Sequence, residues 1–142
     1  MKNTQLASSL RTVTSRLFKR LRQEINTVDK LSLTEVSTLS NLYHYEPLAP
    51  STMAEMVMIK AQSMSQIITR LEDFGLITKT PSESDKRKVA ISLSQQGRLM
   101  VEKTRNERDQ WLNSAINERL NPEEKKILAQ AVVLMEKLVE HQ

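Results

Sequence analysis

Apolar positions recur at helical spacing over most of the chain. They follow one another at intervals of three or four residues along 6–28 and 127–139, and they share one face of a helix along 62–74. Residues 88–93 instead alternate between apolar and small or polar side chains, as a half-buried strand does. The pattern predicts a mainly helical α+β chain with a small sheet near residue 90.

Particular residues mark where these helices begin and end. Ser32 and Glu35 have the spacing of a capping box, and the helix that they open stops before Pro47. Asn121, followed by a proline and two glutamates, predicts the start of the last helix. Gly75 is expected to end the helix over 62–74 as a left-handed cap.

A short helix and a turn come before the helix over 62–74. Ser51 or Thr52 is expected to cap this short helix, which runs to Val57, with Glu55 completing a second capping box from Thr52. Two helices joined by a tight turn are predicted here.

A β-hairpin follows at once. Residues 76–80 and 88–93 read as its strands, and residues 81–85 have turn chemistry. Ser94 is expected to cap a long helix that reaches about Leu120. A helix–turn–helix with a hairpin directly after it is a winged helix.

These elements suggest one domain rather than several. No repeat, low-complexity tract or long linker interrupts residues 1–142. Within this single domain we expect a winged helix-turn-helix lobe over 33–94. The segments 1–30 and 95–142 flank the lobe as helices.

The apolar face of the helix over 62–74 is expected to point into the core, together with nearby methionines. The expected core residues are Met64, Ile67, Ile68, Leu71 and Phe74 on this helix, and Met53, Met56 and Met58 before it. Methionine fills irregular gaps in a core, so packing is the main interpretation of this methionine density; oxidation to sulfoxide as a signal is the alternative.

Composition excludes several classes of site. The 142 residues include no cysteine, two glycines and two histidines. Disulfides, thiolate metal sites and cysteine nucleophiles are therefore absent, and with His44 and His141 far apart we expect no metal and no cofactor. Neither a nucleophile–base pair, nor a carboxylate dyad, nor a phosphate-cradling glycine loop is apparent, so we expect no enzyme.

The distribution of charge points to a polyanion as partner. The net charge is +4, and residues 1–30 carry seven basic against two acidic groups, while residues 76–94 carry four against two. An ordinary solvated surface is the alternative. No apolar run approaches the ~20 residues that span a bilayer, and the N-terminus does not resemble a secretory signal. We expect a cytoplasmic protein without a membrane partner.

The polar face of the helix over 62–74 has the chemistry of a DNA-reading surface. It carries amides, hydroxyls and one guanidinium rather than a mixture of glutamate and lysine: glutamine pairs with adenine, arginine with guanine, and serine or threonine with either. A plain polar surface is the alternative. The candidate DNA-binding residues of this recognition helix are Gln62, Ser63, Ser65, Gln66, Thr69 and Arg70.

The hairpin tip has a different candidate role. Its basic residues suit phosphates or a narrow minor groove, and Asp85 is expected to orient the guanidinium of Arg87. A soluble hairpin edge protected by lysines is the alternative. The candidate wing residues are Ser84, Asp85, Lys86, Arg87 and Lys88.

Residues 48–97 resemble the MarR (multiple antibiotic resistance regulator) family of bacterial winged-helix transcription factors. The resemblance is carried by the segments MAEMVMIKAQSMSQIITRLEDFGLI and SDKRKVAISLSQQG. The second is similar to the family's Asp-x-Arg wing pattern with its apolar strand and glycine, met by Asp85, Arg87, Leu93 and Gly97. Ser94 stands where the family usually has threonine, and either hydroxyl can cap a helix.

The apolar stripes of the first and last helices exceed what one small winged helix can cover. Pairing with a second copy would bury them, as in the family's homodimers, and would present two recognition helices about 34 Å apart to a near-palindromic double-stranded site. Closure of a monomeric core is the alternative. The expected interface residues are Leu6, Leu10, Val13, Ile127, Leu134, Leu138 and Val139.

The resemblance also implies a regulatory mode. Most members are repressors that small phenolic or other aromatic ligands release from DNA, so we expect a bacterial regulator that is nucleoid-associated when bound. By position, Arg16, Arg20, Tyr43, His44 and Trp111 are the candidates for a ligand cleft. The alternative function is a winged-helix module that binds an acidic protein partner.

Overall fold

The computed structural model describes residues 1–24 and 30–142. It divides into two compact units, one formed by Met1–Glu24 with Glu107–Gln142 and the other by Ile25–Asn106. The expected winged lobe over 33–94 falls inside the second unit. Ile25 and Val28, the last positions of the first apolar stripe, lie outside the described residues.

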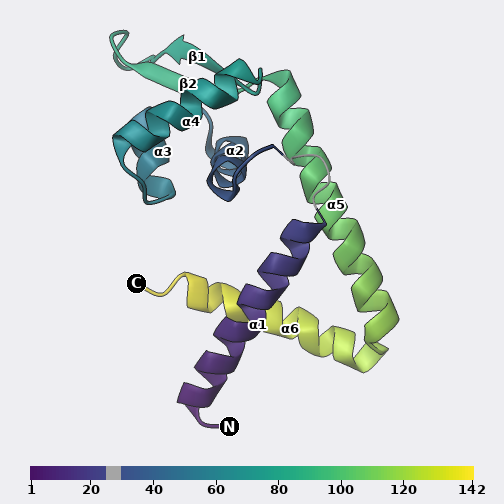
Figure 1. The fold of residues 1–142 in the computed structure, drawn as a ribbon. Helices are drawn as coiled ribbons and strands as arrows, with labels where there is room; N and C mark the ends of the chain where they lie inside the picture. The colour runs from purple at the N-terminus through teal and green to yellow at the C-terminus, as the bar shows by residue number, and fades with distance from the viewer. Residues whose placement is uncertain (25–29) are drawn as a thin grey trace. The chain divides into compact units, whose positions relative to one another are not determined.

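The second unit contains the helix–turn–helix and the hairpin (Figure 1). Its elements are α2 (Leu33–Tyr45), α3 (Pro50–Met56), α4 (Ala61–Asp73), β1 (Ile77–Pro81), β2 (Val89–Leu93) and the first part of α5 (Gln95–Arg119). The predicted order and the winged helix-turn-helix class are confirmed.

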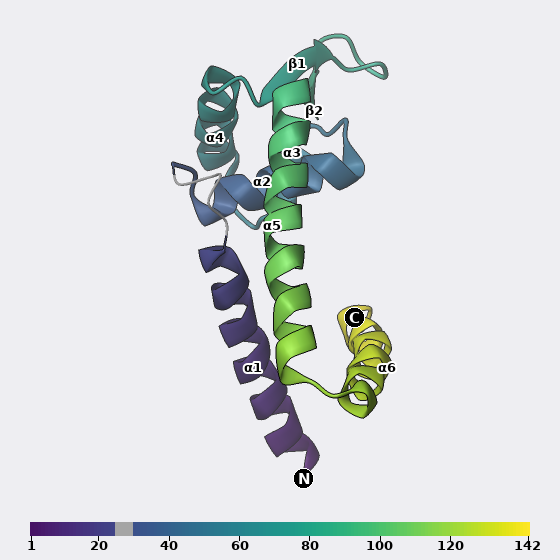
Figure 2. The same cartoon turned by 90° about the vertical axis from the view of Figure 1, so that its right-hand side faces the viewer.

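The first unit is helical throughout. It consists of α1 (Asn3–Gln23), the second part of α5 and α6 (Pro122–Val139). Figure 2 shows α5 as one continuous helix. Neither α1 nor α6 contains a buried residue. Among the described residues, no helix has both the length and the apolar character that crossing a membrane requires.

The expected capping residues act at most of the helix ends. The Ser32 hydroxyl accepts a hydrogen bond from the Glu35 N–H (3.1 Å), and the Glu35 carboxylate accepts one from the Ser32 N–H (3.0 Å). Asn121 accepts from Glu124 N–H at 2.9 Å at the start of α6. Gly75 has the left-handed φ of 74° expected after α4.

The start of α3 differs from the prediction. The N-cap is Ala49, which makes no side-chain cap bond, and the first helical residue is Pro50. Ser51 and Thr52 therefore lie inside the helix rather than at its cap. Proline explains the shift, because its fixed φ suits the first helical position and its missing N–H is not needed there.

The hairpin is antiparallel and is joined by a third segment. Its register pairs Ile77 with Leu93 and Pro81 with Val89, so each strand begins one residue later than predicted. Leu48 bridges Ile91 through two hydrogen bonds of 2.9 and 2.8 Å. This bridge, which the sequence pattern did not predict, ties the chain after α2 to the wing.

One hydrophobic core holds the second unit together. Its buried residues come from every element of the unit: Leu31, Leu39, Leu42, Met53, Ala54, Met64, Ile68, Leu71, Leu76, Ile77, Ile91, Leu93 and Val101. Three expected core residues are instead exposed: Met56 (37%), Phe74 (44%) and Met58 (91%). Phe74 is the C-cap of α4, Met56 is the last residue of α3 and Met58 lies in the turn after it, so all three stand where an element ends and neighbouring elements cover less of each side chain.

Candidate nucleic-acid interface

The outer face of α4 is polar, exposed and held from behind. Met64, Ile68 and Leu71 are buried on the inner face, and this anchoring fixes which side chains α4 turns outward. Gln62, Ser63, Ser65, Gln66 and Thr69 are all exposed. Together with Arg70 and Asp73, all of these but Ser63 line an open groove of about 470 Å³ along the helix.

Most hydrogen-bonding groups on this face have no partner within the described structure. Thr69 and Arg70 are the exceptions, and the Thr69 hydroxyl donates to the Ser65 carbonyl at 3.0 Å. That bond uses the hydroxyl proton of Thr69 within the helix. The side-chain amides of Gln62 and Gln66 can therefore pair with hydrogen-bond donors and acceptors of a binding partner.

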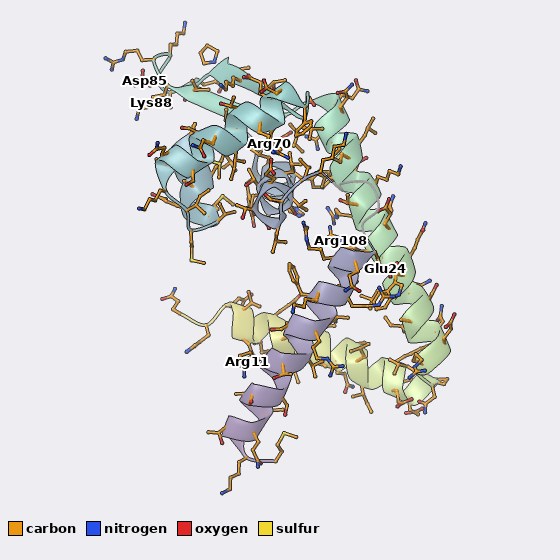
Figure 3. All side chains as sticks on the ribbon, viewed as in Figure 1. Arg11, Glu24, Arg70, Asp85, Lys88 and Arg108 are labelled. Carbon is orange, nitrogen blue, oxygen red and sulfur yellow. The ribbon has the colours of Figure 1, made fainter. Side chains whose placement is uncertain are left out.

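Arg70 is placed differently from the other recognition-helix candidates. Its Nε lies 3.0 Å from a carboxylate oxygen of Glu35, and an Nη donates to the Lys30 carbonyl at 2.6 Å. Its guanidinium also lies 5.3 Å from the centre of the Phe74 ring. Arg70, labelled in Figure 3, is therefore engaged within the protein.

A second groove separates α4 from the start of α2. It has a volume of about 380 Å³, and Ser32 and Glu35 form part of one wall while Ser63, Gln66 and Arg70 contribute to the other. Ser63 thus lies at the border of the outer face, as its helical position predicts.

The wing tip presents its basic residues in an ordered turn. Asp85 accepts hydrogen bonds from the backbone N–H (3.0 Å) and the Nε (3.3 Å) of Arg87, which confirms its expected orienting role. The Asp85 carbonyl accepts from the Lys88 N–H at 2.9 Å and closes the turn. Figure 3 labels Asp85 and Lys88 at this tip.

Side chains at the tip are open to an external partner. Arg87 is 92% exposed, and neither of its Nη nitrogens has a partner in the described structure. Lys86 and Lys88 are exposed beside it, and Ser84 is exposed with its hydroxyl 3.0 Å from that of Ser82. The tip can therefore contact phosphates with several donors at once.

Comparison with known proteins agrees with this geometry. The model of the MarR family matches residues 31–89. An HTH-type transcriptional regulator from Mycobacterium bovis is 32% identical over 138 residues, which cover 97% of this chain and 95% of the relative. The chain belongs to the MarR family. It is a DNA-binding transcriptional regulator and not an enzyme, as the resemblance predicted.

Solved structures share the fold of this MarR protein over nearly its whole length. A candidate transcriptional regulator protein from Pseudomonas aeruginosa has a TM-score of 0.88 and 26% identity, with full coverage of both chains. A variant of MepR from Staphylococcus aureus, bound to an oligodeoxyribonucleotide, has a TM-score of 0.69 and 19% identity over 95% of this chain and 98% of that one.

The expected ligand-cleft residues of the MarR protein fall into two groups. In the first unit the Arg20 guanidinium lies 4.5 Å from the centre of the Trp111 ring, and Arg16 is exposed. In the second unit the rings of Tyr43 and His44 lie 5.4 Å apart, edge to face. The structure thus places Arg20 beside Trp111 and Tyr43 beside His44.

Two arginines beside Tyr43 were missed by the sequence reasoning. Arg98 and Arg105 of α5 place their guanidinium groups 5.4 and 5.1 Å from the Tyr43 ring centre, and the Tyr43 hydroxyl donates to Glu102 at 3.4 Å. The two arginines are seven residues apart, so they lie on the same face of a helix. This spacing is the feature of the sequence that could have identified them as a pair.

The expected dimer positions of the MarR protein are largely uncovered. Leu10 is half-buried, and the remaining six are more than half exposed: Leu6 (54%), Val13 (59%), Ile127 (64%), Leu134 (58%), Leu138 (61%) and Val139 (85%). Six of the seven positions are therefore more exposed than buried in the single subunit.

The turn before α4 contains a strained residue. Met58 has a φ of 55°, which costs a non-glycine residue about 1–2 kcal/mol, and its 91% exposed side chain buries almost nothing in return. We expect Met58→Gly to raise the free energy of unfolding by about 0.5–1 kcal/mol, since the greater freedom of unfolded glycine offsets part of the relief. Urea unfolding at fixed protein concentration measures this.

Met58→Ala is the matched control, because alanine keeps the Cβ that causes the strain. It should unfold at the same urea concentration as the unmodified protein. A gain for alanine equal to that for glycine would attribute the effect to the methionine side chain instead of the backbone.

Proposed function

We propose that this MarR protein is a homodimeric repressor that recognises a near-palindromic operator with α4 and grips the adjacent backbone with its wing. The observation that carries the proposal is the exposed amide and hydroxyl face of α4, anchored from behind by Met64, Ile68 and Leu71. The wing residues Ser84, Lys86, Arg87 and Lys88 are assigned to phosphates or to the minor groove. The oligonucleotide-bound MepR structure, which shares the fold, supports DNA as the partner of this fold.

The side chains on α4 favour particular base pairs. Gln62 and Gln66 carry amides that pair with the N6 and N7 atoms of adenine, and the Thr69 methyl group suits the methyl group of thymine. Ser63 and Ser65 add hydroxyls that accept or donate. We therefore expect A·T pairs where α4 meets the major groove of each half-site.

The apolar faces of α1 and α6 are proposed to pair with a second copy. Neither helix has a buried residue, and a two-fold axis would cover both faces in one step. The axis would also set two α4 helices about 34 Å apart, at successive major grooves.

A small aromatic ligand is proposed to release the repressor. In the first unit Arg20 lies over Trp111, with Arg16 nearby in sequence, and in the second unit Tyr43 lies beside His44. Each pair by itself offers cationic or aromatic groups that suit a phenol or an aromatic acid. Such a ligand would act by binding the DNA-free form more tightly than the bound form.

Selection of bound fragments from genomic DNA, repeated with aromatic acids, tests this function. We expect one enriched palindrome, bound at least about 10³-fold more tightly than its scrambled version, and release by an active ligand. The alternative function, an acidic protein partner for the basic face, is favoured if no base order is preferred. Salt dependence alone does not separate the two, because both contacts are electrostatic.

The two DNA-contacting elements should fail in different ways when altered. Arg87→Ala should weaken binding to every sequence and reduce the slope of log K against log salt by roughly one per subunit, because a phosphate contact is lost. Gln66→Ala should cost ~1–3 kcal/mol at particular base pairs only. Binding titrations on an operator and its single-base variants, at several salt concentrations, measure both effects.

An equal loss on every sequence for both variants would contradict this division of roles. Glu83→Gln is a matched control at the tip, since Glu83 is exposed beside the basic residues and is assigned no DNA contact. It should leave the base preference unchanged.

A further inference from the structure

Arg70 joins three segments of the second unit. It belongs to α4, it pairs with Glu35 in the first turn of α2, and it donates to the carbonyl of Lys30 just before α2. These contacts link positions 35 and 40 residues away in sequence. No other side chain on the outer face of α4 is tied to a different segment within the described residues.

The Glu35 carboxylate is buried and therefore depends on the ion pair with Arg70. Glu35 is only 4% exposed. One of its oxygens accepts the Ser32 N–H and completes the capping box of α2. The other lies 3.0 Å from Arg70 Nε but makes no hydrogen bond of good geometry to the described residues, so the ion pair is its compensation. A buried carboxylate without a facing cation is strongly unfavourable.

The ion pair adds a directional contact to the apolar packing of α4. Burial of Met64, Ile68 and Leu71 sets which face of α4 is outward, but apolar contacts have little directional preference, whereas a carboxylate–guanidinium pair has a defined direction. Arg70 lies one turn after Gln66 on the same side of the helix. Any rotation of α4 about its axis would therefore displace Gln66 and at the same time break the contacts of Arg70 with Glu35 and Lys30.

We propose that Arg70 is a positioning residue for DNA reading and makes no base contact itself. Through Glu35 and Lys30 it holds α4 in the orientation that enters the major groove. This inference rests on the proposed function of α4. Without the link, α4 occupies the docking orientation for only a fraction of the time, and the apparent dissociation constant rises by the inverse of that fraction on every sequence.

Glu35→Gln tests the proposal at a residue that is buried and is assigned no base contact. Glutamine can still accept the Ser32 N–H and so keep the capping box, while the ion pair is lost. We expect operator binding to weaken by about tenfold and by the same factor on each single-base variant, so that the order of base preference is preserved.

Glu72→Gln is the matched control. It removes the same charge from the same unit, but Glu72 is exposed on α4, and among the residues that the structure describes its carboxylate pairs with Lys79 alone, at 3.4 Å. Losing a negative charge near DNA should leave binding equal or slightly tighter, opposite in sign to Glu35→Gln. Circular dichroism at the assay temperature establishes that both variants are folded.

If Glu35→Gln does not fold, Arg70→Lys tests the proposal instead. Lysine keeps the buried carboxylate compensated, but a single ammonium replaces the planar fork that reaches both Glu35 and Lys30. We expect the same uniform weakening on all operator variants. A changed preference at one base pair for Arg70→Lys, or operator binding by Glu35→Gln equal to that of the unmodified protein, would overturn the proposal. Failure of the unmodified protein to prefer any sequence would instead overturn the proposed function.

Discussion

Gly97→Ala should destabilise the protein by about 4 kcal/mol or more, the range reached when a side chain is forced into occupied space. A Cβ at this position would lie 2.0 Å from the Leu76 carbonyl oxygen, and real Cβ contacts essentially never fall below 3.0 Å. Because the free energy of unfolding of a natural protein is about 5–15 kcal/mol in total, such a loss would remove a large part of it. The urea concentration at half-unfolding measures the loss.

The surroundings of Gly97 cannot move aside easily. The Leu76 carbonyl accepts the Ser94 N–H at 3.0 Å, and the Gly97 N–H donates to the Ser94 hydroxyl at 3.0 Å. That hydroxyl donates in turn to the Gly75 carbonyl at 2.6 Å. Relieving the clash would break the contacts that begin α5 against the turn between α4 and β1.

Gly75→Ala is the control for this prediction. Gly75 has a φ of 74°, which costs alanine about 1–2 kcal/mol, but the nearest atom to its Cβ would be the flexible end of Gln96, at 3.0 Å. We therefore expect a loss several-fold smaller than for Gly97→Ala. Equal losses for the two variants would show that backbone conformation, rather than close approach of α5 to the turn before β1, is what demands glycine.

Local signals in the sequence were sufficient for most of the fold. The capping boxes at Ser32 and Asn121, the left-handed Gly75 and the alternation in β2 each depend on residues within a few positions of one another. Such short-range hydrogen bonds and periodicities have the same physical meaning before and after folding. For this reason the winged helix could be predicted in the correct order.

Contacts between distant segments could not be predicted in this way. Arg70 has the helical position of a base-reading residue, and only the folded chain brings Glu35 and Lys30 to it. The bridge between Leu48 and Ile91 likewise depends on tertiary structure. The exposure of Gln62, Ser65 and Gln66 on one face of α4 could therefore be predicted from the sequence, whereas the environment of Arg70 could not.

Two errors in the predicted core concern residues at the end of an element. Phe74 continues the apolar stripe of α4 in sequence, but it is the C-cap, and its ring lies beside the Arg70 guanidinium. Met58 was assigned to the core by composition, whereas its left-handed φ places it in an exposed turn. At such positions the arrangement of neighbouring elements, which the local sequence does not encode, decides whether a side chain is buried.

Leu134→Glu should abolish the proposed dimer and, with it, tight binding to the operator. Leu134 is 58% exposed in the single subunit, so the glutamate costs the subunit itself little. In a two-fold interface the substitution occurs twice, and each buried charge without a partner costs several kcal/mol. A loss of at least about 4 kcal/mol, or roughly a thousandfold in the dimer dissociation constant, is expected.

Sedimentation measures the association state, and titration of a full operator against a single half-site measures its consequence for DNA. The variant should sediment as one subunit and bind both DNA molecules equally weakly, because the gain from two linked half-sites is gone. Ala129→Glu adds the same charge to α6 on the side away from the Leu134 stripe and should remain dimeric. A Leu134→Glu variant that stays dimeric and still distinguishes the full operator from the half-site would place the subunit contact elsewhere than on this face of α6.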